Sequence, residues 1–178
     1  MLHALPFALL PSRVHEAQGS GRVIFAIWQA QRRPHAVWVR AKRQSEMPLF
    51  PGMTVIHAEG TDILWAAEEA LRSMPRALVI AQPDQRLSLM AGRRLQLGAE
   101  AGGSTGLLLI RPEAGSPATE TRWDCRPLAG DSTLHRWDLI KNKKGTTGSW
   151  TLDWDGTSAA FHMVSATGQR SGLAGQPG

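Results

Sequence analysis

The segment TVIHAEGTDILWAAEEALRSMPRALVIAQPD, Thr54–Asp84, contains the pattern of a strand, a helix and a second strand. It begins with a short apolar run and ends with another, Ala77–Ala81, and such runs are typical of buried strands. Between them, apolar residues recur at helical spacing on one face: Ile63, Leu64, Ala67, Ala70, Leu71 and Met74. Pro75 ends this helix. The segment therefore predicts one unit of an α/β fold.

The same alternation continues on both sides of this segment. Ala36–Arg40 predicts a strand before it, and Thr105–Ile110 predicts another after it. Between Ala81 and Thr105, residues 87–98 predict a second helix, with Met90 on its apolar face. Strands that alternate with helices form a parallel sheet covered on both faces. The core is then expected to include Ile63, Leu71, Val79, Leu108 and Ile110.

After Arg111 the apolar period changes from helical spacing to strict alternation. The stretches ETRWDCRPL, LHRWDLI and SWTLDW alternate, and KNKKGTTG between the last two has the glycines of a hairpin turn. The sequence thus predicts a mainly parallel central sheet flanked by helices, with a C-terminal antiparallel hairpin extension. We expect one domain over residues 1–165. Residues 166–178 have no apolar period, which predicts a flexible tail.

Composition narrows the class of protein. The single cysteine, Cys125, excludes an intrachain disulfide and is expected on a half-buried strand. No apolar run approaches the about 20 residues of a membrane span, so a cytoplasmic protein is expected. The histidines lack the spacing of metal ligands, and we expect neither metal nor cofactor. From Ala17 to Ser45 there are basic residues and no acid, which fits nucleic acid binding and a solvated surface equally well.

The stretch HEAQGSGRVIFAIWQ, His15–Gln29, looks like a phosphate-binding loop that leads into a helix. A working loop reads G-x-x-x-x-G-K-[ST], whereas only Ser20 separates Gly19 from Gly21 here. The lysine position is Arg22, and the position of the Mg²⁺-binding hydroxyl is Val23. A loop this short does not wrap its N–H groups around a phosphate. Gly19, Gly21 and Arg22 are therefore interpreted as vestigial.

From Val55 onward the order of segments resembles the core of RecA. LWAAEEALRS, RRLQLGAEAGG and KNKKGTTGSWTLDW are similar to segments of the ImuA family, small RecA-like proteins of bacterial mutasome cassettes. The resemblance covers roughly Arg13–Asp155 and implies a RecA-like fold. ImuA proteins usually have a longer N-terminal segment before the loop, which we expect this chain to lack.

The resemblance also bears on catalysis and on DNA binding. It places Gln82 where the family has its Mg²⁺-linked aspartate, and Lys42 where RecA has the glutamate that activates water. Together with the short loop, these differences remove the metal, the phosphate cradle and water activation, so no catalytic residue is expected. Residues 112–120, which match the second DNA-binding loop, hold no lysine or arginine. DNA contact is therefore expected to be weak.

The implied function is that of a non-catalytic component of SOS-induced, error-prone translesion DNA synthesis. The implied partners are an ImuB-like inactive homologue of Y-family polymerases, RecA, and indirectly an error-prone polymerase; self-association is left open. Two alternatives are a divergent RecA-like ATPase and an inhibitor of cell division similar to SulA. The hairpin lysines Lys141, Lys143 and Lys144 are interaction candidates, because the matching RecA lysines reach the γ-phosphate bound by a neighbouring subunit. The other interpretation is a solvated turn.

Overall fold

A computed structural model describes residues 7–44, 51–130, 133–155 and, for the backbone, 160–171. The elements in chain order are β1 (Val14–Gln18), α1 (Arg22–Ala30), β2 (Ala36–Arg40), β3 (Met53–His57), α2 (Asp62–Ser73), β4 (Leu78–Ala81), α3 (Leu89–Gly102), β5 (Thr105–Leu109), β6 (Thr121–Pro127), β7 (Leu134–Asn142), β8 (Thr146–Asp155) and β9 (Ala160–Ser171). Each strand and helix of the Thr54–Asp84 segment is confirmed, because the two short apolar runs and the helical period between them are clearly separated in the sequence.

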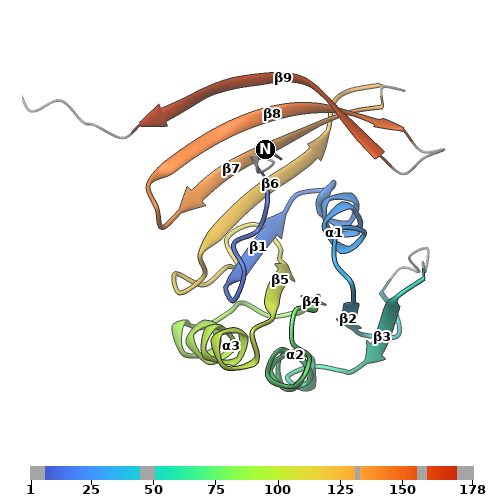
Figure 1. Ribbon diagram of the computed structural model, residues 1–178, viewed down its shortest axis with the longest axis vertical. Coiled ribbons are helices and arrows are strands. Elements are labelled where there is room, and N and C mark those ends of the chain that lie inside the picture. The colour runs from blue at the N-terminus through green and yellow to red at the C-terminus, as the bar shows by residue number, and fades with distance from the viewer. Residues whose placement is uncertain (1–6, 45–50, 131–132, 156–159, 172–178) are drawn as a thin grey trace, which may run out of the picture.

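All strands belong to one nine-stranded sheet with the order β3-β2-β4-β5-β1-β6-β7-β8-β9 (Figure 1). Neighbours from β3 to β6 are parallel, and β6 to β9 are antiparallel. The predicted mixed α/β sheet is confirmed. The antiparallel part is longer than the expected hairpin, because β9 pairs with β8 as far as Ser171. The prediction of a tail from residue 166 is wrong up to Ser171, and residues 172–178 lie outside the described part.

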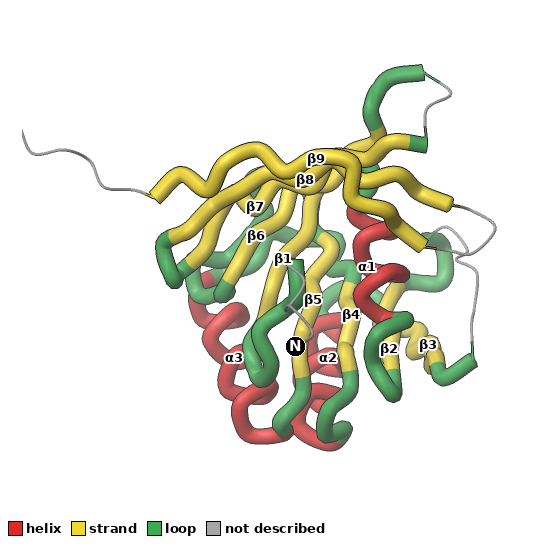
Figure 2. Tube along the Cα trace, turned by 45° about the horizontal axis from the view of Figure 1, so that its top comes forward, coloured by secondary structure: helices red, strands yellow, loops and turns green. Residues whose placement is uncertain are grey.

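The helices cover the sheet from both sides. Helices α2 and α3 pack side by side on one face, while α1 lies on the other, beneath the antiparallel strands that curve over it (Figures 1 and 2). The core on the α1 side is rich in aromatic residues: Phe7, Phe25, Trp28, Trp123, Trp137 and Trp150. Phe25 and Trp137 meet edge to face with ring centroids 4.8 Å apart. This contact joins α1 to the curved end of the sheet.

The core on the α2 and α3 side contains the apolar residues expected from the sequence. Ile63, Leu71, Val79, Leu108 and Ile110 are all buried, as predicted. The expected apolar face of α3 is partly wrong, because the Met90 side chain is 73% exposed. The buried face of α3 instead consists of small residues and one leucine: Gly92, Leu95, Gly98, Ala99 and Gly102. Small residues face inward because α2 lies very close. A Cβ atom on Gly102 would be 1.8 Å from the Leu71 carbonyl oxygen.

None of the helices within the described residues has the length and apolar character needed to cross a membrane.

Cys125 lies on β6 as predicted but is fully buried, and burial raises the pKa of its thiol well above the ordinary value.

Candidate functional site

The turn between β1 and α1 lies directly against strand β6. The Gly21 N–H donates a hydrogen bond to the Cys125 carbonyl oxygen over 2.8 Å. Gly19 has φ of +89°, and a Cβ atom there would be 2.3 Å from the same oxygen. The Arg22 guanidinium folds back and donates to the Gly19 carbonyl oxygen over 2.9 Å. The two glycines thus allow the turn to pack closely on β6, and one N–H that a phosphate cradle would need binds the Cys125 carbonyl oxygen instead.

A polar cavity of about 470 Å³ lies beside this turn, at the carboxyl ends of the central parallel strands. Its charged lining residues are Arg22, Arg43, Asp84 and Arg111. Asp84 is 3.7 Å from the Arg43 guanidinium, measured from Oδ2 to Nη2. The carboxyl edge of a parallel sheet is the usual place for ligands in α/β proteins. The excess of arginine over acid makes this cavity attractive to anions.

Gln82, which the resemblance placed at the position of a Mg²⁺-linked aspartate, lines this cavity. Its amide oxygen accepts a hydrogen bond from the Trp38 indole N–H over 2.7 Å. Gln82 therefore orders the end of β4 rather than presenting a charged oxygen. Lys42 is exposed, and its backbone N–H binds the Glu59 carboxylate over 3.1 Å. Neither side chain carries a carboxylate.

Two of the three hairpin lysines bind backbone carbonyl oxygens of the same chain. The Lys141 ammonium donates to the carbonyl oxygens of Ser116, Pro117 and Thr119 at 3.2, 3.1 and 2.8 Å. The Lys143 ammonium donates to the Ala118 carbonyl oxygen over 2.7 Å. Lys141 is half-buried and Lys143 is exposed, so a freely solvated turn describes this pair only in part. Contact of these lysines with a partner stays a prediction. Burial lowers the pKa of Lys141. Lys144 lies exposed at the turn.

A buried ion pair lies under the same loop. Glu16 on β1 is fully buried, and its Oε2 is 2.8 Å from the Arg122 Nε on β6. Its Oε1 accepts a hydrogen bond from the Ser116 N–H over 2.6 Å. Arg122 also donates to the Ser116 carbonyl oxygen. The segment 112–120 is thus bound by Lys141 and Lys143 of the β7–β8 hairpin and by the Glu16–Arg122 ion pair. Together these contacts hold it against the sheet. The resemblance described under Sequence analysis placed a DNA-binding loop at this segment, and DNA contact there stays a prediction.

Sequence reasoning did not find this ion pair. The local sequence gives no clear signal, because β1 reads VHEAQ and its polar residues do not predict the burial of Glu16 that the structure shows. The partner Arg122 is far away in sequence and becomes adjacent because β1 pairs with β6 in the register Glu16↔Arg122. A charged residue in a buried strand requires such a partner.

The basic segment Ala17–Ser45 does not form a continuous charged surface. Arg40 is buried, and the Arg33 guanidinium donates to the Leu9 carbonyl oxygen over 3.2 Å. The Arg32 guanidinium carbon lies 3.4 Å from the centre of the Trp28 ring. Charges that are adjacent in sequence therefore make separate structural contacts, while Arg32, Lys42 and Arg43 remain exposed. Nucleic acid binding by this segment stays a prediction.

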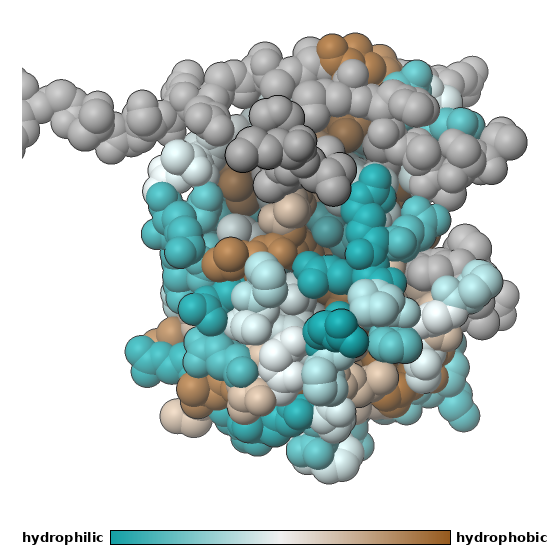
Figure 3. All heavy atoms as spheres, viewed as in Figure 1, coloured by the Kyte–Doolittle hydropathy of each residue, from teal (hydrophilic) through white to brown (hydrophobic). Residues whose placement is uncertain are grey.

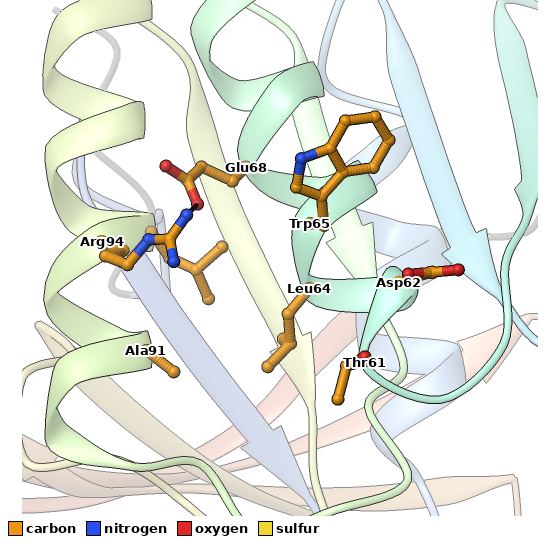
Figure 4. A pocket seen from close by; sticks show the side chains of 8 residues that line it. Thr61, Asp62, Leu64, Trp65, Glu68, Ala91 and Arg94 are labelled. Atoms are coloured by element: carbon orange, nitrogen blue, oxygen red, sulfur yellow. Dashed lines mark ion pairs between the residues drawn. The ribbon is translucent and has the colours of Figure 1, made fainter.

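The helical face carries exposed apolar residues that the sequence did not single out. Figure 3 shows brown, hydrophobic residues among hydrophilic ones over this part of the molecule. A hollow of about 380 Å³ lies between α2 and α3, closed on one side by the Glu68–Arg94 ion pair at 2.9 Å (Figure 4). Trp65 borders it and is 62% exposed. Trp65 also borders a second hollow, of about 540 Å³, between α2 and the end of β3.

Among the residues that the structure describes, no three His, Cys, Asp or Glu side chains gather as a metal ion would require. In comparisons with known proteins, the chain matches no protein-family model, and no curated protein is significantly similar to it.

Proposed function

We propose that the chain is a non-catalytic, RecA-like interaction protein of the error-prone translesion synthesis machinery. The observation that carries the proposal is the contact between the Gly19–Arg22 turn and β6. In a phosphate-binding loop, consecutive backbone N–H groups converge on the phosphate. Here the Gly21 N–H binds the Cys125 carbonyl oxygen, and Gly19 is packed against that same oxygen.

The other components of phosphoryl transfer point the same way. Val23 has no oxygen to bind Mg²⁺, and the amide of Gln82 is occupied by Trp38. Phosphoryl transfer needs the phosphate cradle, the metal and a positioned nucleophile at the same time. Anion binding in the arginine-lined cavity is compatible with this proposal, whereas ATP hydrolysis is not.

The proposed partners are inferred from the resemblance to ImuA. They are not inferred from a binding surface on the molecule. They are an ImuB-like polymerase homologue and RecA, which would connect the chain to an error-prone polymerase. A parallel core followed by antiparallel strands is the architecture that this resemblance implied, and it supports the proposal at the level of fold.

The experiment combines a binding test with a test for hydrolysis. The purified chain is titrated with the ImuB-like protein and with RecA, both taken from the same organism as the chain. In a separate experiment it is titrated with Mg-ATP by calorimetry. We expect micromolar or tighter binding to at least one protein partner, and no turnover of ATP. Turnover would favour the divergent ATPase. Binding to the division protein FtsZ instead would favour the SulA-like alternative.

A further inference from the structure

Strand β3 forms one edge of the sheet that the described residues build. Among the residues that the structure describes, β2 is its only strand partner, and the two strands are parallel. The Ala36 N–H donates to the Gly52 carbonyl oxygen, and the Ala58 N–H donates to the Arg40 carbonyl oxygen. These two hydrogen bonds show that Gly52 and Ala58 direct their backbone groups toward β2. Because the backbone groups of successive residues alternate in direction, Met53, Val55 and His57 point theirs away from β2. Within the described part of the chain, no strand pairs with them.

This edge lacks the features that normally prevent edge-to-edge pairing. The sequence MTVIH contains no lysine, acid or proline, and its pairing with β2 shows no bulge. Met53 and Val55 pack on the α1-side core, while Ile56 and Ala58 pack on the other. All four remain half-buried, in contrast to the fully buried β2. Both apolar faces of the sheet therefore stop at an open edge, which is the surface that one more strand would complete.

The surroundings of the edge extend this apolar surface. The hollow of about 540 Å³ beside β3 is lined by Ile56, Ala58, Trp65 and Ala66, together with His57 and Asp62. Trp65 is 62% exposed there, although burial of a tryptophan is strongly favourable. A strand added to β3 would place side chains over this hollow and cover part of the indole.

We propose that β3 pairs antiparallel with β3 of a second copy of this chain, about a two-fold axis at Val55. The strand suits itself as a partner, because the axis places Val55 opposite Val55 and Met53 opposite His57. No like charges meet, and each outward N–H faces a carbonyl oxygen of the other copy. A two-fold contact is closed, so it gives a dimer and not a fibre. The proposal does not depend on the partners proposed above.

Disulfide trapping of single-cysteine variants tests the register. In the proposed pair the two Val55 Cα atoms are about 5.5 Å apart, within the range that a disulfide spans. Two Thr54 residues would lie on a diagonal, with Cβ atoms about 7 Å apart or more, beyond that range. The native Cys125 is fully buried and does not compete. Under mild oxidation Val55→Cys should form a covalent dimer and Thr54→Cys should not. Equal yields from the two variants, or no dimer from either, would overturn the proposal.

Sedimentation equilibrium of the full chain tests the association without a crosslink. We expect a reversible dimer for the unmodified protein at micromolar concentrations. Two matched double variants then differ only in the sign of one charge: Met53→Lys/His57→Lys places like charges opposite each other, and Met53→Glu/His57→Lys places opposite charges there. The dissociation constant of the like-charged variant should be about tenfold higher or more, because each contact occurs twice about the axis. A monomeric unmodified protein, or equal constants for the two variants, would refute the pairing.

Discussion

Replacing Glu16 by glutamine removes the negative charge of the buried ion pair while keeping its shape. Glu16 is fully buried, and the side chain of its partner Arg122 is 22% exposed. Removing one partner of a buried pair costs about 3–5 kcal/mol, because the remaining charge is left uncompensated. Arg122 keeps its contact with the Ser116 carbonyl oxygen and some access to water. We therefore expect a loss of about 2–3 kcal/mol in the free energy of unfolding, below the fully buried limit.

The assay is urea unfolding followed by tryptophan fluorescence, which the seven tryptophans of the chain make sensitive. The matched control is Glu100→Gln, the same substitution in the exposed pair of Arg13 and Glu100, whose side chains are 37% and 45% exposed. An exposed pair contributes at most about 1 kcal/mol. The midpoint should therefore shift clearly for Glu16→Gln and little for Glu100→Gln at unchanged slope. Equal shifts would refute the argument that the buried pair anchors the 112–120 segment.

Three further predictions concern the loop, the core and a buried histidine. Arg22→Lys should not create ATPase activity, because the turn stays bound to Cys125 and Val23 offers no oxygen; Mg²⁺-dependent phosphate release would contradict this. Leu71→Ala should cost about 2–5 kcal/mol because its side chain is fully buried, whereas Leu97→Ala, at a 57% exposed position, should leave the melting temperature nearly unchanged. Burial lowers the pKa of His15 from 6.5 to about 4, so its contribution to stability is complete above pH 6.5 and is lost as the pH falls toward 4. The unfolding free energy should therefore drop by up to about 3 kcal/mol over that range, and His15→Gln, which cannot titrate, should show a smaller drop measured by the same urea series.

The sequence by itself determined the elements whose signal is local. The helix of the Thr54–Asp84 segment is confirmed from Asp62 to Ser73, because its apolar period continues over several turns and ends at a proline. The strand with Trp123 and Cys125 inward is confirmed for the same reason, since alternation alone decides which side chains face the core. The short spacing between Gly19 and Gly21 could also be read directly, because loop length and residue types are properties of adjacent positions.

The tertiary structure decided everything that depends on which strands are neighbours. Residues 166–171 have no apolar period, and they belong to β9 because β8 offers backbone groups along their length. Glu16 meets Arg122, and Gly19 packs on Cys125, only because β1 lies between β5 and β6 in the sheet. Lys141 and Lys143 bind the 116–119 carbonyl oxygens because the β7–β8 hairpin returns beside that segment. These contacts join residues far apart in the chain, and no pattern within a short window of sequence encodes such a pairing.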